Sequence, residues 1–257
     1  YSTEELNLYT DKEKLLESRN KVFNQWDSLC TFQDKEIMTE IENSGLERIA
    51  GVRDPIVRSQ LTPNHPFGCK RPLFSDKFYP IFNRDNVKLI CEPIQAINDH
   101  GIQTEKGFNK HDVLIFSTGF ETTTYLSAIN VTGRNGKTLM DAWGDGPQAY
   151  LGVTTSGFPN LFMLYGPNTN QGCILYMIEK QVEYTIRQIT RIREKGLNWI
   201  DLDPEILKSF NEKVQKEISQ VDVWQASCGN DFYYRAGPSG RLVTQWPNSM
   251  TAYEDAI

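Results

Sequence analysis

The chain of 257 residues contains 39% hydrophobic residues and carries a formal charge of -6 at pH 7. An acidic chain has no basic face to offset phosphate charge, so no nucleic-acid partner is expected. No stretch approaches the roughly 20 consecutive apolar residues that a bilayer requires, so no membrane span is expected either.

The five cysteines and three histidines are scattered along the sequence. No CxxC pair occurs and no histidine has a partner four residues away, so no metal site is expected, because zinc needs three or four converging ligands. Widely spaced single cysteines are typical of a reducing compartment in which thiols stay free, which favours a cytoplasmic location. The chain begins with Tyr1 and no signal region follows, which we interpret as the start of a fragment.

The first sixty residues are predicted to be helical. Thr10 and Glu13 have the spacing of a capping box, and a second helix is expected from about Asp34 to Ala50. Asp54 followed by Pro55 predicts the start of a third helix. Proline has no N–H, but at the first helical position this group would have no hydrogen-bond partner within the helix, so its absence costs nothing. The first helix places Leu15, Val22 and Trp26 near one face, and the second has an apolar stripe of Ile37, Ile41, Leu46 and Ile49.

From Leu61 the pattern changes. Several prolines and a glycine break the helical pattern and place Lys70 and Arg71 on an irregular loop. Three short runs are typical of strands: Val87–Cys91, Pro93–Asn98 and Asp112–Ser117. The last is almost continuously apolar, as expected of a strand that is covered on both faces.

Further along, Asn135-Gly136 predicts a hairpin turn. The apolar run Leu161–Leu164 leads into a glycine-rich loop and then into the clearest helix of the chain, Cys173–Lys195, which Gly196 is expected to close. Ile174, Met177, Ile178, Val182, Ile186, Ile189 and Ile192 form its apolar stripe, which we expect to lie in the core. A further helix is expected over about Pro204–Gln220.

The unit of strand, glycine-rich loop and helix has two interpretations. It can hold an anion or nucleotide at the helix N-terminus, where unpaired N–H groups and the helix dipole favour negative charge. Alternatively, Gly166–Gly172 is only a tight connection. The residues alone leave both open.

Two other motifs are set aside. Gly144–Ala149 matches the letters of G-x-G-x-x-A, but it does not follow a strand or open a helix, as a dinucleotide fingerprint must. Gly136-Lys137-Thr138 resembles the end of a phosphate-binding loop but lacks its first glycine, and a hairpin turn explains it better.

From residue 60 onward the sequence resembles the Baeyer–Villiger monooxygenases. The matching blocks are LTPNHPFGCKRP at Leu61–Pro72, DVLIFSTGF at Asp112–Phe120, AYLGVTTSGFPNLFMLYGPNTN at Ala149–Asn170, and Trp246-Pro247. The second block is similar to the family's ATG-F/Y linker motif. Enzymes of this family contain an FAD domain interrupted by an NADP domain, both doubly wound α/β domains.

The resemblance implies an incomplete α/β chain that holds the C-terminal parts of both domains. Residues 1–117 would be the end of the NADP domain, including the helical region, and residues 118–257 the end of the FAD domain. The glycine fingerprints of both domains lie upstream of the matched part. Without these turns, which hold the pyrophosphates, we expect the isolated chain to be inactive.

The resemblance also implies chemistry: with FAD and NADP as cofactors, molecular oxygen forms a flavin peroxide that inserts oxygen next to a ketone carbonyl. Arg71 would stabilise the peroxide and contact the nicotinamide, since an arginine keeps its charge. Lys70 would bind an NADP phosphate. The alternative is a solvated Lys-Arg pair on a loop. The remaining implied cofactor contacts are Thr118, Gly119, Asn168, Asn170 and Gly172.

The chain also departs from the family pattern. The stretch between Asn170 and Ile174 is shorter than in many relatives, which puts the start of the helix and the flavin contacts in question. Phe232-Tyr233 stands where many relatives carry Trp-Tyr, close to the nicotinamide and substrate, so these two residues are candidate substrate contacts.

Two other functions compete with ketone oxidation. One is a flavin-containing monooxygenase that oxidises nitrogen or sulfur and shares the linker motif. Lys70-Arg71 in its PFGCKRP context favours the ketone, because heteroatom oxidation needs no such cation. The other is a non-catalytic, truncated remnant, favoured by the lack of any valid dinucleotide fingerprint.

Overall fold

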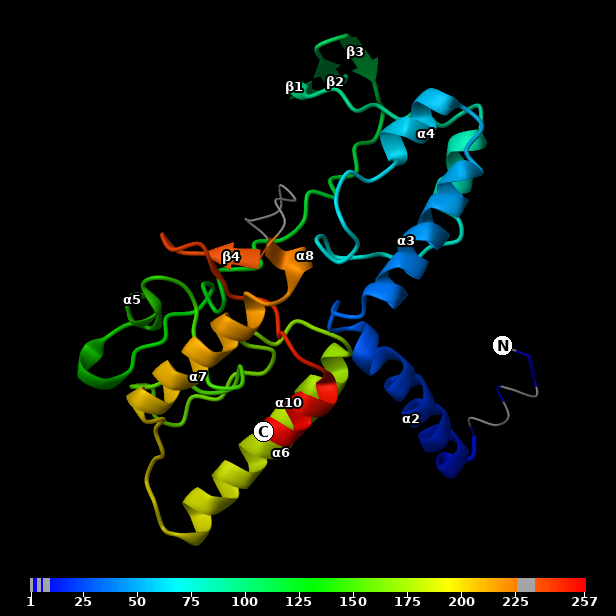
Figure 1. Ribbon diagram of the computed structural model, residues 1–257. Coiled ribbons are helices and arrows are strands. Elements are labelled where there is room, and N and C mark those ends of the chain that lie inside the picture. Colours follow the sequence, from blue (N-terminus) through cyan, green and yellow to red (C-terminus); the bar gives the residue numbers. More distant parts are fainter. Residues whose placement is uncertain (1, 4–5, 7–9, 226–233) are drawn as a thin grey trace. The chain divides into compact units, whose positions relative to one another are not determined.

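The computed structural model describes residues 2–3, 6, 10–225 and 234–257 (Figure 1). By their contacts the residues divide into two compact units. Unit 1 comprises Tyr1–Met38, Gly68–Lys70 and Glu121–Ile257, and unit 2 comprises Thr39–Phe67 and Arg71–Phe120. This division follows packing alone, and the assignment of residues 1–117 and 118–257 to two cofactor domains stays a prediction.

The N-terminal region is helical, as predicted. Its described helices are α2 (Lys12–Leu29), α3 (Lys35–Ala50) and α4 (Pro55–Leu61). The predicted start of α4 is confirmed, because the Asp54 carboxylate accepts from the N–H groups of Ile56 and Val57 at 2.7 and 3.2 Å.

The capping box predicted at Thr10 is wrong. The N-cap of α2 is Asp11, whose carboxylate accepts from the N–H groups of Glu13 and Lys14. A carboxylate one residue further along competes for the same N–H groups and also complements the positive end of the helix.

The apolar faces of these helices are largely not buried. No described residue of α2 is buried, and Val22 is 50% exposed. In α3, Ile49 is buried whereas Leu46 is 46% exposed. Periodicity identifies the apolar face of a helix, but burial also needs another element on that face.

Unit 2 contains a 3-10 helix, η1 (Tyr79–Asn83), and an antiparallel sheet in the order β1 (Ile94–Asn98), β2 (Gly101–Thr104) and β3 (Gly107–Lys110). The side chain of Asn83 fastens η1 to the turn after α3. Its oxygen accepts from the Arg53 N–H at 2.8 Å, and its nitrogen donates to the Gly51 carbonyl at 2.9 Å.

Of the three strands predicted in this region, only Pro93–Asn98 is confirmed, as β1. Val87–Cys91 and Asp112–Ser117 form no strand, and the side chains of Val113 and Ile115 are 76% and 86% exposed. An apolar run becomes a strand only when another segment pairs with it, and no described segment pairs with these two.

Unit 1 carries the remaining described elements. They are η2 (Arg134–Gly136), α5 (Leu139–Trp143), α6 (Ile174–Glu194), α7 (Pro204–Ile218), α8 (Asp222–Gln225), α10 (Met250–Ala256) and the antiparallel pair β4 (Arg235–Ala236) and β5 (Arg241–Leu242). The predicted helices α6 and α7 are confirmed. Gly196 has φ +60 and follows the end of α6, as predicted.

The predicted hairpin turn and the rejection of the Gly144–Ala149 motif are both confirmed in unit 1. Asn135 and Gly136 have φ +60 and +73, and an antiparallel bridge joins Thr132 to Thr138 on either side of them. Gly144 caps the end of α5, so the Gly144–Ala149 run follows a helix and is not a dinucleotide fingerprint. Leu161–Leu164, by contrast, is not a strand.

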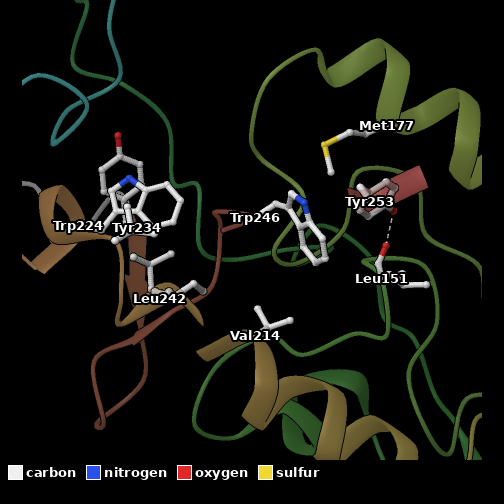
Figure 2. Packing of buried hydrophobic residues seen from close by; sticks show 10 residues of the cluster. Leu151, Met177, Val214, Trp224, Tyr234, Leu242, Trp246 and Tyr253 are labelled. Carbon is white, nitrogen blue, oxygen red and sulfur yellow. Dashed lines mark hydrogen bonds between the residues drawn. The ribbon is translucent and has the colours of Figure 1, made fainter. Parts of the chain in front are cut away.

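The main core of unit 1 joins α6, α7 and α10 to the C-terminal segment (Figure 2). Its buried members are Leu151, Met177, Val214, Ile218, Val221, Trp224, Tyr234, Leu242, Trp246 and Tyr253. The rings of Trp246 and Tyr253 meet edge to face, with centroids 5.3 Å apart. A second cluster comprises Leu139, Trp143, Ala149, Phe158 and Met163.

The stripe of α6 is only partly core, contrary to the prediction. Met177 is fully buried, but Val182, Ile186 and Ile189 are 40%, 55% and 48% exposed. Gln181 is fully buried instead. Its side-chain amide is satisfied, because the oxygen accepts from the N–H of Tyr165 at 2.7 Å and the nitrogen donates to the Tyr253 hydroxyl at 2.9 Å. A hydrogen-bonded amide can therefore occupy a core position.

The Tyr253 hydroxyl is central to this core. It donates to the Leu151 carbonyl at 2.6 Å (Figure 2) and accepts from Gln181, and burial raises the pKa of the phenol. We expect Tyr253→Phe to lower the free energy of unfolding by about 2 kcal/mol, because a buried donor and a buried acceptor each lose a partner. Urea unfolding measures this loss.

Tyr79→Phe is the control, because no hydrogen bond of the Tyr79 hydroxyl occurs in the described residues. We expect it to change stability by less than about 0.5 kcal/mol. Equal effects of the two substitutions would contradict the role of the buried hydroxyl.

Three further findings concern the cysteines, metal binding and membrane spans. Cys69 is disulfide-bonded, so the expectation that all thiols stay free is wrong, because spacing in sequence does not reveal contacts in space. Within the described ranges, no group of three histidine, cysteine or acidic side chains is placed to hold a metal. No described helix is long and apolar enough to cross a membrane.

Candidate functional site

The loop before α6 is fastened to the C-terminal segment by Asn168. This residue is buried and has φ +57, a conformation that asparagine tolerates better than most residues. Its side-chain nitrogen donates to the carbonyls of Leu242 and Gln245, both at 3.0 Å, and its N–H donates to the Val243 carbonyl at 2.8 Å. Asn168 therefore fixes the path of the loop.

Asn170 is held equally firmly. The Tyr165 hydroxyl donates to its side-chain oxygen at 2.8 Å, and its side-chain nitrogen donates to Gln245 Oε1 at 2.7 Å. Its backbone forms a parallel bridge with Gln245, and its N–H donates to the Thr244 carbonyl at 2.8 Å. Both ends of the Asn170 amide are therefore occupied by the protein.

Gly172 allows the loop to approach α10 closely. It has φ +58, and a Cβ atom at this position would lie 2.6 Å from Met250 Sδ. The same sulfur accepts from the N–H of Cys173 at 2.9 Å. A side chain at residue 172 would have to displace the Met250 side chain and would be strained at this φ, so glycine is favoured here.

The N-terminus of α6 begins directly after this loop. Its N-cap, Cys173, makes no side-chain cap. In the part of the chain that the structure describes, the N–H groups of Ile174, Leu175 and Tyr176 have no hydrogen-bond acceptor. Such a helix end attracts an anion or a carbonyl oxygen.

Two buried polar atoms next to this helix end have no partner. Gln171 is 7% exposed and Thr244 is 2% exposed, and neither Gln171 Nε2 nor Thr244 Oγ1 makes a hydrogen bond in the described residues. Asn170 is the residue before Gln171, and its N–H donates to the carbonyl of Thr244, so Thr244 lies in the segment that pairs with the loop. Buried polar atoms are usually hydrogen-bonded, so these two atoms leave unused hydrogen-bonding capacity beside the helix end.

Charged side chains connect α6 to α10 beside the same helix end. Lys180 Nζ lies 2.8 Å from Glu254 and 3.4 Å from Glu183, and the Tyr176 hydroxyl donates to Glu254. The hydrogen bond from Lys180, followed by that from Tyr176, lowers the pKa of Glu254 below 4.5. These contacts hold α10, and with it Met250, against α6.

We expect the Lys180–Glu254 pair to stabilise unit 1 in a pH-dependent way. Because the pKa of Glu254 is lowered in the folded protein, its contribution is complete above the unfolded value of 4.5 and is lost as the pH falls through the folded value. At pH 7, Glu254→Gln should reduce stability by about 0.5 kcal/mol, since the Glu254 carboxylate is partly exposed to solvent.

Chemical unfolding between pH 7 and pH 3 measures this effect, with Glu212→Gln on α7 as the control, since Glu212 forms no ion pair in the described chain. The difference between Glu254→Gln and the unsubstituted chain should shrink toward acid pH. A difference that persists unchanged at low pH would contradict this assignment.

Helix α2 packs against the same part of unit 1. The carboxylate of Asp27 accepts from the N–H and hydroxyl of Thr251 and from the N–H of Met250 at the start of α10. The rings of Phe23 and Tyr176 also meet, with centroids 4.6 Å apart. The positions of Gly172 and Met250 therefore depend on three helices.

The other candidate residues lie elsewhere. Lys70, at the edge of unit 1, and Arg71, in unit 2, are exposed, and neither side chain makes a hydrogen bond or ion pair in the described ranges. Thr118 and Gly119 are exposed residues of unit 2, and Gly119 has φ +91. Phe232 and Tyr233 lie outside the described residues.

The structure thus brings together three of the predicted residues, Asn168, Asn170 and Gly172, in unit 1. No pattern in the sequence indicates Gln171 or Thr244. Their side chains stand out only because they are buried without partners, and burial by segments some 70 residues away leaves no local signal in the sequence.

No protein-family model matches the chain. It is 37% identical over 209 residues to an FAD-binding monooxygenase (ktnD) of Aspergillus niger, covering 79% of this chain and 34% of that protein. It is also 37% identical over 199 residues to a Baeyer–Villiger monooxygenase of Pseudomonas aeruginosa, covering 76% of this chain and 37% of that protein. The chain therefore spans little more than a third of these relatives.

Solved structures of monooxygenases also match the fold of this chain. OTEMO in complex with FAD and NADP has a TM-score of 0.75 at 29% identity, covering 86% of this chain and 42% of that chain. A steroid monooxygenase bound to NADP has a TM-score of 0.75 at 27% identity, covering 86% of this chain and 43% of that chain. The predicted fold class, an incomplete part of a mixed α/β enzyme, is confirmed. Over about three quarters of its length, the chain is a relative of the Baeyer–Villiger monooxygenases and corresponds to a part of these enzymes.

Proposed function

We propose that this chain is part of an FAD- and NADPH-dependent monooxygenase that uses molecular oxygen to insert an oxygen atom next to a ketone carbonyl. The observation that carries the proposal is its relationship to Baeyer–Villiger monooxygenases over 76% of its length. The structural neighbour solved with FAD and NADP supports the choice of cofactors. We further propose a cytoplasmic location, which the free thiols of Cys30, Cys91 and Cys173 favour although Cys69 is disulfide-bonded.

In this proposal the loop before α6 faces the flavin. Asn168 and Asn170 would hold the loop in place, and Gly172 would keep the helix end close to α10, as their contacts within unit 1 support. The unpaired N–H groups of the first turn would then favour negative charge on the reduced flavin ring. Bound FAD would react with molecular oxygen, and no amino-acid side chain performs this reaction.

The remaining assignments concern NADP and the substrate. Lys70 would bind a phosphate of NADP and Arg71 its nicotinamide half, and Thr118 and Gly119 would lie beside a cofactor in the link between the two domains. The exposure of the Lys70 and Arg71 side chains and their lack of described protein partners support a role in ligand binding. Phe232 and Tyr233 would contact the ketone.

The experiment compares the chain alone with a chimaeric enzyme in which it replaces the corresponding part of the Pseudomonas aeruginosa relative. We expect the chimaera to bind FAD and to oxidise NADPH when a ketone is added, with one atom of labelled oxygen gas in the ester product. The chain alone should show no turnover.

The two competing functions give different results in this experiment. A heteroatom-oxidising enzyme would convert a thioether to its sulfoxide and leave the ketone unchanged. A non-catalytic remnant would give a chimaera that folds but neither binds flavin nor consumes NADPH.

A further inference from the structure

Gln171 is the least explained polar residue near the N-terminus of α6. It is only 7% exposed, and its Nε2 atom has no hydrogen-bond partner in the described residues. A buried amide without a partner costs about 1–3 kcal/mol, so such a group is rarely kept without a ligand.

The backbone around Gln171 is fixed from both sides. On one side, Asn170 is bound through its side chain to Tyr165 and Gln245. On the other, Gly172 contacts Met250 and cannot be replaced without moving it. The backbone of Gln171 is therefore held next to the helix end, and its side chain is buried.

The helix end offers a second, independent feature. Helix α6 has 21 residues, and within the described chain the N–H groups of its first turn have no acceptor. Gln171 adds an N–H donor to this set, only three residues before the first helical residue. A ligand edge that carries several acceptor atoms matches such a group of donors.

We propose that the Gln171 side-chain amide donates a hydrogen bond to the carbonyl-bearing pyrimidine edge of the flavin ring at the N-terminus of α6. This inference rests on the proposed function and adds a binding residue to it. A neutral amide suits a carbonyl acceptor in both flavin redox states, whereas the helix end responds to the negative charge of the reduced ring.

The test is NMR spectroscopy of the ¹⁵N-labelled chain, 257 residues, titrated with FMN or with ribitol 5-phosphate, which is the tail of FMN without the ring. Gln171→Leu identifies the Gln171 amide signal by its loss. We expect this signal to shift with FMN and not with ribitol 5-phosphate. Gln171→Leu should weaken FMN binding about threefold to tenfold, the value of one hydrogen bond.

Gln220→Leu, which changes an exposed glutamine after α7, is the matched control and should leave FMN binding unchanged. If Gly172 and Cys173 signals shift with FMN while the Gln171 amide does not, the inference is wrong and the proposed flavin site stands. If no signal at this helix end shifts with FMN, the inference is wrong, while FAD binding by the chimaeric enzyme decides the proposed function separately. An equal shift with ribitol 5-phosphate would assign the site to phosphate and overturn the inference.

Discussion

Replacing Gly152 with alanine is expected to lower the free energy of unfolding by about 3 kcal/mol, through overpacking and backbone strain together. Gly152 has φ +67, and a Cβ atom there would lie 2.1 Å from Thr169 Cγ2 and 3.1 Å from the Pro167 carbonyl oxygen. Thr169 cannot move aside easily, because it is fully buried and its hydroxyl donates to the Gly166 carbonyl at 2.6 Å. Urea unfolding measures the effect.

Gly157→Ala provides a matched control in the same unit. Gly157 has φ +84, so alanine is strained there too, but no atom lies within 4 Å of its added Cβ. This substitution should therefore cost only about 1 kcal/mol, the backbone contribution. If the two variants lose equal stability, the contact between Gly152 and the loop before α6 does not carry the effect.

The Gly152→Ala variant also bears on the candidate site. The threonine that the new methyl group would strike, Thr169, lies between Asn168 and Asn170 in the loop before α6. A shift of Thr169 would therefore disturb the hydrogen bonds from Asn168 to Leu242 and Gln245. We expect FMN binding to weaken in this variant and to stay unchanged in Gly157→Ala.

Helix positions could be predicted from the sequence because their signals are local. Asp54-Pro55 marked the start of α4, and Gly196 marked the end of α6, since caps act within one turn of the helix. Burial could not be predicted in the same way. Val182 and Ile186 continue the apolar stripe of α6 but are exposed, whereas Gln181 is buried because Tyr253 and Tyr165 supply its hydrogen bonds.

Strands illustrate the same limit more clearly. Ile94–Asn98 pairs with a neighbour only a few residues away and was predicted correctly. Asp112–Ser117 has a stronger apolar pattern, but it needs a partner strand and no described segment supplies one. The resemblance could likewise indicate Asn168, Asn170 and Gly172, whereas Gln171 became a candidate only from its burial.

Arg71→Ala is expected to lower ketone turnover by the chimaeric enzyme about 100- to 1000-fold, the loss typical when a group that stabilises developing charge is removed. Negative charge develops while oxygen is transferred to a carbonyl, and an arginine side chain supplies a permanent positive charge. Its side chain is exposed and makes no described contact with the protein, so the substitution should leave stability within about 0.5 kcal/mol of the original.

Lys70→Ala is the matched control, because it removes the neighbouring positive charge from the same loop. We expect it to raise KM for NADPH with a smaller change in kcat, since a phosphate contact contributes to binding before and during the reaction alike. Arg71→Lys should recover part of the lost turnover, because it restores the charge without the planar guanidinium.

The same pair of variants separates the two kinds of oxygen transfer. Oxidation of a thioether does not require a fixed cation, so Arg71→Ala should reduce sulfoxide formation far less than ester formation. If both products fall equally, Arg71 acts on a step that they share, such as NADPH binding or flavin reduction. Rapid mixing of the Arg71→Ala chimaera with NADPH alone distinguishes these cases, because the loss of absorbance of oxidised flavin measures the rate of flavin reduction. A normal rate would place the defect after flavin reduction, where the charge of Arg71 is proposed to act.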